Sequence, residues 1–258
     1  MNLPEVIYYT DELNDEFSPM TLTPPVIDAS YRYTDDRRSK KAARFFLYRF
    51  IAYPAAFLWS KCVFMRKIVG KEKLKAYRHT GYFLYGNHTQ PTGDALMQAC
   101  LTWPETNYVI VHPNNLVVPV IGRFTPALGA LPLPGDMGSY RNFKKAIAQR
   151  SGEGHPIVVY PEAHIWPYYT GIRPFPDTSF SYPVELGKPS FCFVNTYRKR
   201  RFSKRPKIVT YIEGPFFPED PEHPRAARKA LRDRIYRTMT DLASRSDVEM
   251  IKYIKKEP

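Results

Sequence analysis

The sequence is poor in cysteine, and its most apolar segment lacks a long uncharged run. Three cysteines, Cys62, Cys100 and Cys192, are too few and too scattered for a disulfide framework or a zinc site. The longest uncharged run in the apolar segment, Phe50 to Ser60, is well short of the roughly 20 residues that a membrane-spanning helix needs. We therefore exclude a disulfide-rich scaffold and a spanning helix in this segment, and we expect a reducing, cytosolic compartment.

Positive charge is missing from the first 28 residues, which hold six acidic residues. The whole chain nevertheless carries a formal net charge of +13, so the remainder is strongly basic and favours an anionic partner. Because the sequence begins with acidic and polar residues, it does not resemble a secretory signal. We expect residues 1–41 to form a polar arm, of which residues 1–28 are extended or loosely docked.

Residues 42–69 are expected to form a helical element that contacts a membrane. The segment Ala42–Met65 is rich in Phe, Tyr, Leu and Ala, and basic residues flank it on both sides. An aromatic, amphipathic helix with basic flanks suits the interface of an anionic membrane. This indicates a peripheral, monotopic protein on the cytoplasmic face of a membrane. The alternative is a helical hairpin, kinked at Pro54, that packs entirely on the protein.

Apolar strands alternate with amphipathic helices in the remaining sequence, residues 70–258. This alternation predicts a single α/β domain with a mixed, mostly parallel sheet covered by helices. A chain of 258 residues with 43% hydrophobic residues is long enough to bury such a core. The expected strands are 82–85, 108–111, 128–134 at an edge, 157–160, 190–197 and 207–213, and the expected helices include 139–150 and 224–244.

A histidine and an aspartate follow the first of these strands. Two glycines bound the strand 82–85, so His88 lies just past its end. A Pro-Thr-Gly turn comes next, and Asp94 then opens the apolar segment 95–101, where Thr92 or Asp94 can cap a helix. The turn can bring the carboxylate of Asp94 back onto the ring of His88.

Such a pair is suited to general base catalysis. A carboxylate bonded to one imidazole nitrogen fixes the tautomer, so the other nitrogen can take a proton from a hydroxyl. No Gly-x-Ser-x-Gly elbow occurs in the chain, so the hydroxyl would belong to a substrate. Asn87 and the backbone amides of the 89–93 turn are candidate oxyanion donors. The alternative is a polar loop in which His88 and Asp94 only satisfy backbone groups.

At these residues the chain resembles the glycerolipid acyltransferase family of the lysophosphatidic-acid type, and four blocks occur in the family's order. The first block of the family is Asn-His, four residues and Asp, which Asn87, His88 and Asp94 match with a spacer of five residues. The fourth block is a proline before an apolar strand, which Pro189 and the residues after it match. The resemblance covers residues 70–215, and it implies an α/β acyltransferase fold.

The second block of the family is Gly-x-x-Phe-Ile-x-Arg, whose arginine is credited with holding the phosphate of the acceptor. Residues 129–134 match the front of this block, but Pro134 or Gly135 stands at the position of the arginine. Arg123 and Arg141 are the nearby candidates to bind the substrate in its place. The alternative is that both are solvated surface charges.

The third block of the family is Phe-Pro-Glu-Gly-Thr-Arg-Ser. Residues 160–162, Tyr-Pro-Glu, match its first half, whereas residues 163–165 do not match the second half. Glu162 follows a buried strand, at the sheet edge where open α/β sheets gather their ligands. The resemblance implies that Glu162 helps to bind the acceptor, with Arg173 as the candidate for the missing positive charge. The alternative is a helix cap or a buried salt bridge between Glu162 and Arg173.

Residues 198–205 form the densest basic cluster in the sequence. The cluster suits anionic lipid headgroups or the phosphates of coenzyme A. A single aromatic residue, Phe202, is thin support for stacking on bases, so no nucleic acid partner is expected. The alternative is a solvated hairpin tip.

The resemblance implies transfer of a fatty acyl group from acyl-CoA or acyl-ACP, the acyl carrier protein thioester, to a lipid hydroxyl. The acceptor would be a lysophospholipid, a glycerol-phosphate or a related lipid, with His88 as general base and Asp94 holding the imidazole. No cofactor is expected beyond the acyl thioester co-substrate, and no ligand spacing supports a metal site. Two other interpretations stay open: a non-catalytic lipid- or membrane-binding protein, and a thioester or lipid hydrolase.

Overall fold

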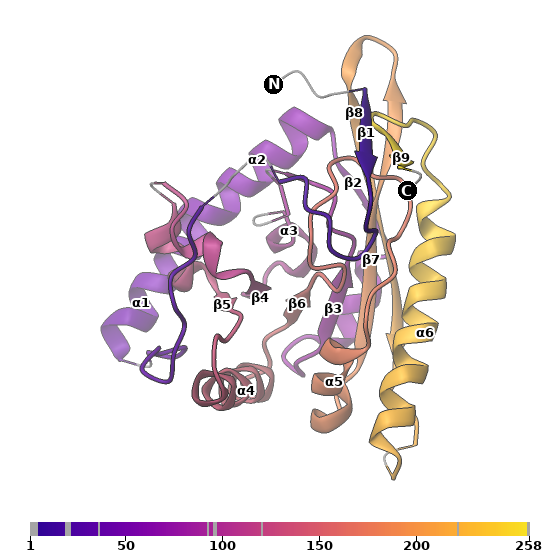
Figure 1. Ribbon diagram of the computed structural model, residues 1–258. Helices are drawn as coiled ribbons and strands as arrows, with labels where there is room; N and C mark the ends of the chain where they lie inside the picture. The colour runs from indigo at the N-terminus through magenta and orange to yellow at the C-terminus, as the bar shows by residue number, and fades with distance from the viewer. Residues whose placement is uncertain are drawn as a thin grey trace.

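The computed structural model of the chain is shown in Figure 1. It describes residues 5–18, 22–35, 37–91, 93–94, 97–119, 121–220 and 222–256. A seven-stranded sheet forms its centre. The strands of this sheet are β2 (Lys67–Val69), β3 (Phe83–Gly86), β4 (Tyr108–Val111), β5 (Ala130–Pro132), β6 (Ile157–Val159), β7 (Ser190–Arg200) and β8 (Ser203–Phe216).

The strand order is β2-β8-β7-β3-β6-β4-β5, and all neighbours are parallel except β7 and β8. The predicted fold class, a single α/β domain with a mixed, mostly parallel sheet, is therefore confirmed. Every expected strand is present, and the proline-rich 128–134 segment supplies β5 at an edge of the sheet, as expected.

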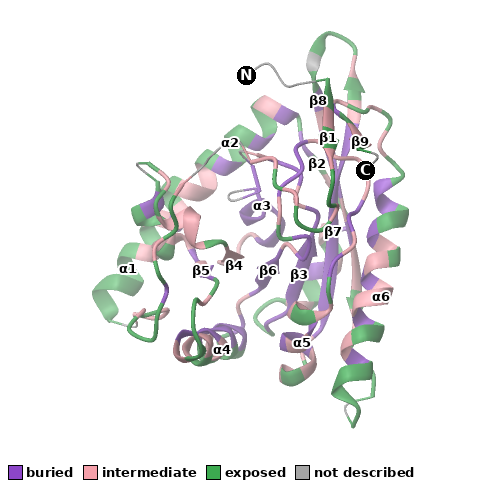
Figure 2. Cartoon of the chain, in the orientation of Figure 1, coloured by how far each residue is buried: buried purple, intermediate pink, exposed green. Residues whose placement is uncertain are grey.

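The two faces of the sheet bury different sets of apolar side chains because neighbouring residues of a strand point to opposite faces. Phe83 and Tyr85 pack with helices α4 (Met137–Gly152) and α6 (Pro224–Ala243). Tyr82 and Leu84 pack on the other face, against the 3₁₀ segment 71–77 and the short helix 99–102. Figure 2 shows the buried residues concentrated on these central strands. The remaining helical elements of this domain are η2 (Lys71–Tyr77), α3 (Ala99–Thr102), η3 (Pro113–Leu116), η4 (Gly122–Phe124), η5 (Pro126–Leu128), η6 (Thr178–Phe180) and α5 (Ser181–Leu186).

The segment expected to contact a membrane is one continuous helical run, coloured violet in Figure 1. Helix α1 (Arg38–Phe46) passes through a π-helical stretch, η1 (Leu47–Ala52), into α2 (Tyr53–Phe64), and the residues at both junctions keep helical dihedral angles. The alternative of a hairpin kinked at Pro54 that packs entirely on the protein is wrong, because the helical run continues through Pro54 and large apolar side chains along it are exposed. No helix in the described ranges is long and apolar enough to span a membrane.

Within the described residues 5–18, the acidic arm is extended and docked on the protein, so of the two expected states a loosely docked tail does not apply there. Strand β1 (Val6–Tyr9) pairs in parallel with β9 (Lys252–Lys255), so a two-stranded sheet joins the two ends of the described chain. This pairing could not be inferred from local patterns, because each strand is only four residues long and its partner is distant in the sequence.

The helix expected to begin at Asp94 is also shorter than predicted. The backbone of residues 93–94 and 97–98 forms turns, and α3 begins only at Ala99 after Gln98. Asp94 is therefore not the cap of this helix, and its carboxylate is free for other donors. Thr92, the other expected cap, lies outside the described residues.

Candidate active site

His88 and Asp94 meet at the carboxyl end of β3. Nδ1 of His88 lies 2.9 Å from Oδ2 of Asp94, and the aspartate side chain is buried while that of the histidine is about a quarter exposed. The last residue of β3 is Gly86, which leaves room for the ring of Phe193, because a Cβ at this position would lie 2.1 Å from that ring. With the Nδ1 proton directed at the carboxylate, Nε2 carries the lone pair that can accept a proton.

The five-residue spacer is accommodated by a hydrogen-bonded turn. The backbone N–H of Gln90 donates to the same Asp94 oxygen at 2.9 Å, so Oδ2 accepts from two groups at once. The N–H groups of Gly93 and Asp94 both donate to the carbonyl of Gln90. The extra residue relative to the family pattern therefore lengthens the turn without separating the pair.

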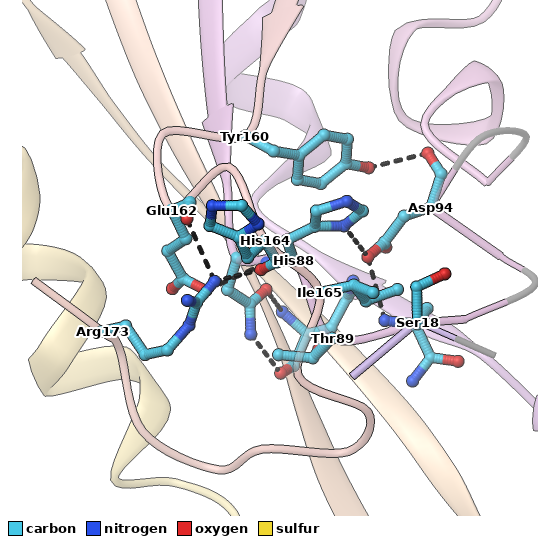
Figure 3. A network of polar contacts seen from close by, with 12 residues as sticks. Ser18, His88, Thr89, Asp94, Tyr160, Glu162, His164, Ile165 and Arg173 are labelled. Carbon is cyan, nitrogen blue, oxygen red and sulfur yellow. Dashed lines mark hydrogen bonds and ion pairs between the residues drawn. The ribbon is translucent and has the colours of Figure 1, made fainter. Parts of the chain in front are cut away.

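Tyr160 forms a wall of the site. Its ring stacks on the imidazole of His88, with centroids 4.6 Å apart, and its hydroxyl donates to the backbone carbonyl of Asp94 at 2.8 Å. Burial raises the pKa of Tyr160 well above its ordinary value, so the hydroxyl stays protonated and keeps this bond. Figure 3 shows Tyr160, His88 and Asp94 together.

Asn87, a candidate oxyanion donor, is occupied by the backbone of β7. Its side-chain oxygen accepts from the N–H of Asn195 at 2.8 Å, and its amide donates to the carbonyl of Asn195 at 3.1 Å. The side chain is buried. Asn87 therefore extends the sheet by one pair of bonds beyond β3 and fixes the direction of the turn that carries His88.

A buried tyrosine holds the middle of the turn. The hydroxyl of Tyr197, on β7, meets the hydroxyl of Thr89 at 2.7 Å and accepts from the side-chain amide of Gln90. Tyr197 is fully buried, so its hydroxyl finds its hydrogen-bond partners on the turn, away from water. The first half of the turn is thus fixed to β7.

Arg66 is a buried cation below the turn. Its guanidinium donates to the hydroxyl of Thr210, to the backbone carbonyl of Met97 and to the side chain of Asn195, at 2.7, 2.8 and 3.3 Å. Burial lowers the pKa of Arg66, whereas the nearby Asp94 acts in the opposite direction. Arg66 follows the end of α2, so it connects the α1–α2 helical run to the segment that carries Asp94.

Glu162 and Arg173 form a buried pair beside His88. An oxygen of Glu162 lies 3.6 Å from the Arg173 guanidinium, and both side chains are fully buried. The same oxygen lies 3.5 Å from the backbone nitrogen of His88, at the outer limit of a hydrogen bond. Burial raises the pKa of Glu162 to about 7, although Arg173 and His88 oppose that shift. A buried pair of Glu162 and Arg173 was the stated alternative to binding of the acceptor by these residues.

Arg173 also binds the loop that follows Glu162. Its guanidinium donates to the carbonyls of Glu162 and His164, and to the carbonyl of Glu12 in the arm at 3.3 Å, while it lies over the ring of Trp166. All of these contacts are internal. Arg173 therefore supports the site from beneath, and no surface of its guanidinium is presented to a ligand.

The acidic arm covers the loop that replaces the second half of the third block. Glu16 accepts from the N–H of Ile165 and lies 3.1 Å from Nδ1 of His164. The indole N–H of Trp166 donates to the carbonyl of Asp15. The backbone N–H of Trp166 donates to the backbone carbonyl of His88 at 3.2 Å. The arm is thus linked through this loop to the candidate general base, and Figure 3 shows His164 and Ile165 of the loop together with His88.

Arg123 and Arg141 lie outside this network. Arg123 is exposed and stacks on Phe124, and Arg141 is exposed on α4, where it contacts only its own helix among the described residues. Arg123 borders a surface hollow of about 510 Å³ that contains no residue of the His88 site. The hollow is lined by Leu116, Val117, Val118, Pro119 and Arg123.

The fold and the site together define a class: an α/β protein with a mixed, mostly parallel sheet and a His–Asp pair at its carboxyl edge. No family model and none of the curated proteins searched matches the sequence. A solved structure does match: the crystal structure of the 1-acyl-sn-glycerophosphate (LPA) acyltransferase PlsC from Thermotoga maritima. The TM-score is 0.56 at 16% sequence identity, over 83% of this chain and 86% of that chain. The resemblance predicted from the four blocks is therefore confirmed at the level of the fold.

Sequence reasoning missed Arg66, Tyr197 and the role of the arm. The signal for Arg66 was weak, since it is one of several basic residues that follow an apolar helix. Tyr197 was seen only as part of a strand. The aromatic residue before Pro161 was noted in the third block, but its stacking on His88 could not be inferred from position alone.

Proposed function

We propose that this protein is an acyltransferase that moves an acyl group from a coenzyme A or acyl carrier protein thioester to a lipid hydroxyl. The observation that carries the proposal is the 2.9 Å contact of His88 with Asp94 at the carboxyl edge of an acyltransferase fold. That edge is where open parallel sheets bind their ligands. The acceptor class is a lysophospholipid, a glycerol-phosphate or a related lipid.

In the proposed reaction, Nε2 of His88 takes the proton of the acceptor hydroxyl while its oxygen attacks the thioester carbonyl. The tetrahedral intermediate then expels the thiolate, which receives the proton from the imidazolium. Asp94 stabilises the imidazolium and keeps the ring in the required tautomer. Tyr160 holds the ring plane through stacking. Because the acceptor supplies the nucleophile, no covalent acyl-enzyme forms.

We also propose that the reaction takes place at a membrane surface. Large apolar side chains are exposed along α1 and α2, and basic residues precede and follow them. Such a surface suits an interface with anionic lipid. The exposed apolar residues of this surface are Phe45, Phe46, Phe50, Ile51, Phe57, Leu58 and Trp59.

The test is thiol release from acyl-coenzyme A and acyl carrier protein thioesters, with liposomes, in the presence and absence of each acceptor. We expect release that requires one acceptor and falls by about 10² to 10⁴-fold in His88→Ala. His223→Ala is the matched control, since His223 also pairs with an aspartate, Asp220, at 3.0 Å but is exposed on the surface. Full activity of His88→Ala would remove the proposed mechanism.

A second candidate is a non-catalytic lipid-binding protein. The observation that favours it is that Arg123 and Arg141 are on the surface and Arg173 is buried, so none of the three contacts His88 or Asp94. It predicts liposome binding without thiol release and no effect of His88→Ala. Release of free fatty acid without any acceptor would instead indicate a hydrolase.

A further inference from the structure

The hairpin of β7 and β8 projects beyond the sheet on the side of the candidate active site. The two strands stay paired up to Arg200 and Ser203, which leaves Arg201 and Phe202 as a two-residue turn. By contrast, β3 pairs with β7 only as far as Phe193. Because β3 and β7 are parallel, residues 198–207 extend past the end of β3, the end that delivers His88. Figure 1 shows this projection at the top of the molecule.

The projecting part of the hairpin is basic throughout. Residues 198–207 include seven Lys and Arg and no acidic residue. Arg198 is paired with Asp247 at 3.1 Å, while Lys199, Arg201 and Arg205 are exposed. A concentration of positive charge on a narrow projection attracts an anionic surface and is not needed to stabilise a two-stranded hairpin.

The tip of the hairpin is aromatic. Phe202 is 89% exposed, the highest value among the exposed large apolar side chains of the described chain. The guanidinium of Arg201 lies over its ring at 5.1 Å. One exposed phenylalanine alone is ordinary, but here the ring lies against Arg201 at the end of a basic projection. An aromatic ring at headgroup depth, with cations at the phosphates, is the arrangement that membrane interfaces favour.

The hairpin continues the α1–α2 surface. Arg200 donates to the carbonyl of Val63 at 2.7 Å, which fixes the hairpin to the end of α2. In Figure 1, the end of α2 and the hairpin lie toward the top of the molecule, whereas α1 lies lower on the left. The outer residues of α2 include Phe57, Leu58 and Trp59, all exposed. The exposed residues of α2 and the hairpin thus belong to neighbouring parts of the surface.

We propose that the hairpin, residues 198–207, is a second membrane contact, which places Phe202 among anionic phospholipid headgroups. Two separate contacts fix the orientation of a bound protein, whereas one contact leaves it free to rotate about that contact. With α2 and the hairpin both engaged, the carboxyl edge of the sheet, where His88 lies, is held at the bilayer. This proposal does not depend on the acyl transfer reaction, because lipid binding is measured without substrates.

The insertion of the tip is tested with a nitroxide label. The label is attached at Phe202→Cys in a Cys62→Ser background, since Cys62 is the exposed cysteine and Cys100 and Cys192 are buried. On vesicles of phosphatidylglycerol and phosphatidylcholine, we expect the label to gain accessibility to oxygen and to lose accessibility to a water-soluble nickel chelate. The same label at Lys229→Cys, exposed on α6, should show no change. A label at position 202 that stays in water on vesicle-bound protein would overturn the proposal.

The role of the charges is tested with matched pairs of substitutions. Arg201→Gln with Arg205→Gln should weaken binding to anionic vesicles by roughly five-fold for each residue. Arg225→Gln with Lys229→Gln removes the same charge from exposed positions on α6 and should have little effect. Equal losses in both pairs would show only diffuse charge attraction and contradict the proposal. The proposal would also be overturned if the protein with Arg201→Gln and Arg205→Gln kept its affinity for vesicles but lost binding to an acidic acyl carrier protein.

Discussion

Asp94 organises the site because one of its oxygens accepts from both the imidazole of His88 and the N–H of Gln90. The second bond holds the carboxylate in place when no substrate is present, so the histidine is oriented in advance. Pre-oriented groups lower the cost of reaching the reactive geometry. The turn that carries His88 and Asp94 is itself held in place by Tyr197 and by the hydrogen bonds between Asn87 and β7.

Glu162 should make stability depend on pH. Its pKa is about 7 in the folded protein and near 4.5 when unfolded, so the folded state binds this proton more tightly. The resulting stabilisation is complete below about pH 4.5 and is lost as the pH rises through about 7. Between these limits, the free energy of unfolding of the wild type should fall relative to Glu162→Gln by up to about 3 kcal/mol.

Urea denaturation of both proteins, at intervals from pH 4.5 to 8, measures this difference. Glu153→Gln is a suitable control, because the pKa of that partly exposed carboxyl is lowered by its hydrogen bonds to Gln149 and Arg150. If the stability curves of wild type and Glu162→Gln run parallel across this range, the carboxyl of Glu162 is ionised throughout and the buried pair is a simple salt bridge.

The sequence was sufficient to place His88 and Asp94 near each other, because strand ends and turn residues act over a few positions. It could not reveal Arg66, whose partner Thr210 is 144 positions away. The role of Glu162 was inferred from a match of three residues, 160–162, to the third block. Whether Glu162 binds a substrate or the cation of Arg173 depends on whether Arg173 is buried. Burial of this kind is decided by long-range packing, which local patterns do not encode.

At the scale of elements, the β1–β9 sheet supports the loop that holds Trp166. The Trp166 ring lies 4.7 Å from that of Tyr9 on β1 and 4.7 Å from that of Tyr253 on β9, measured between centroids. Phe17 adds a third contact at 5.4 Å. The sequence indicated the strands of the main sheet, which have long apolar runs, but β1 and β9 are short and partly exposed, and their patterns are weak.

Two neighbouring tyrosines on β1 provide a matched test of this support. Tyr9 faces Trp166, whereas Tyr8 is 56% exposed. Tyr9→Ala should reduce the free energy of unfolding by about 1 to 2 kcal/mol more than Tyr8→Ala, since only Tyr9 loses an aromatic pair and buried area. Chemical denaturation gives the two values, and equal losses would mean that the arm contributes no packing to the loop.

At the scale of the whole molecule, apolar and basic surface is gathered along α1 and α2, while the acidic arm lies across the loop that packs on the site. Phe46 and Phe50 are both more than half exposed, and their rings stack at 5.4 Å between centroids. Exposed apolar patches of this kind are uncommon on proteins that meet only water. The apolar and basic surface of α1 and α2 is therefore separate from the part of the acidic arm that contacts the loop.

Phe46→Ser with Phe50→Ser should weaken partitioning onto phospholipid vesicles by about ten-fold or more, because two large apolar groups no longer enter the interface. Met137→Ser, which removes an apolar side chain that is 72% exposed on α4, is the control. Vesicle sedimentation over a range of lipid concentrations measures the effect. An equal effect of the two changes would argue against a specific role for the α1–α2 surface.

The pairing of β1 with β9 also sets an order of assembly. During synthesis, the strands of the main sheet are made before residues 252–255, so β1 waits without its partner while the sheet is synthesised. The loop around Trp166 therefore gains its contact with Tyr253 of β9 after its contacts with the arm can form. Since β9 follows every strand of the main sheet in the described chain, a nascent chain can hold a folded sheet while the loop beside the candidate site still lacks one of its aromatic contacts.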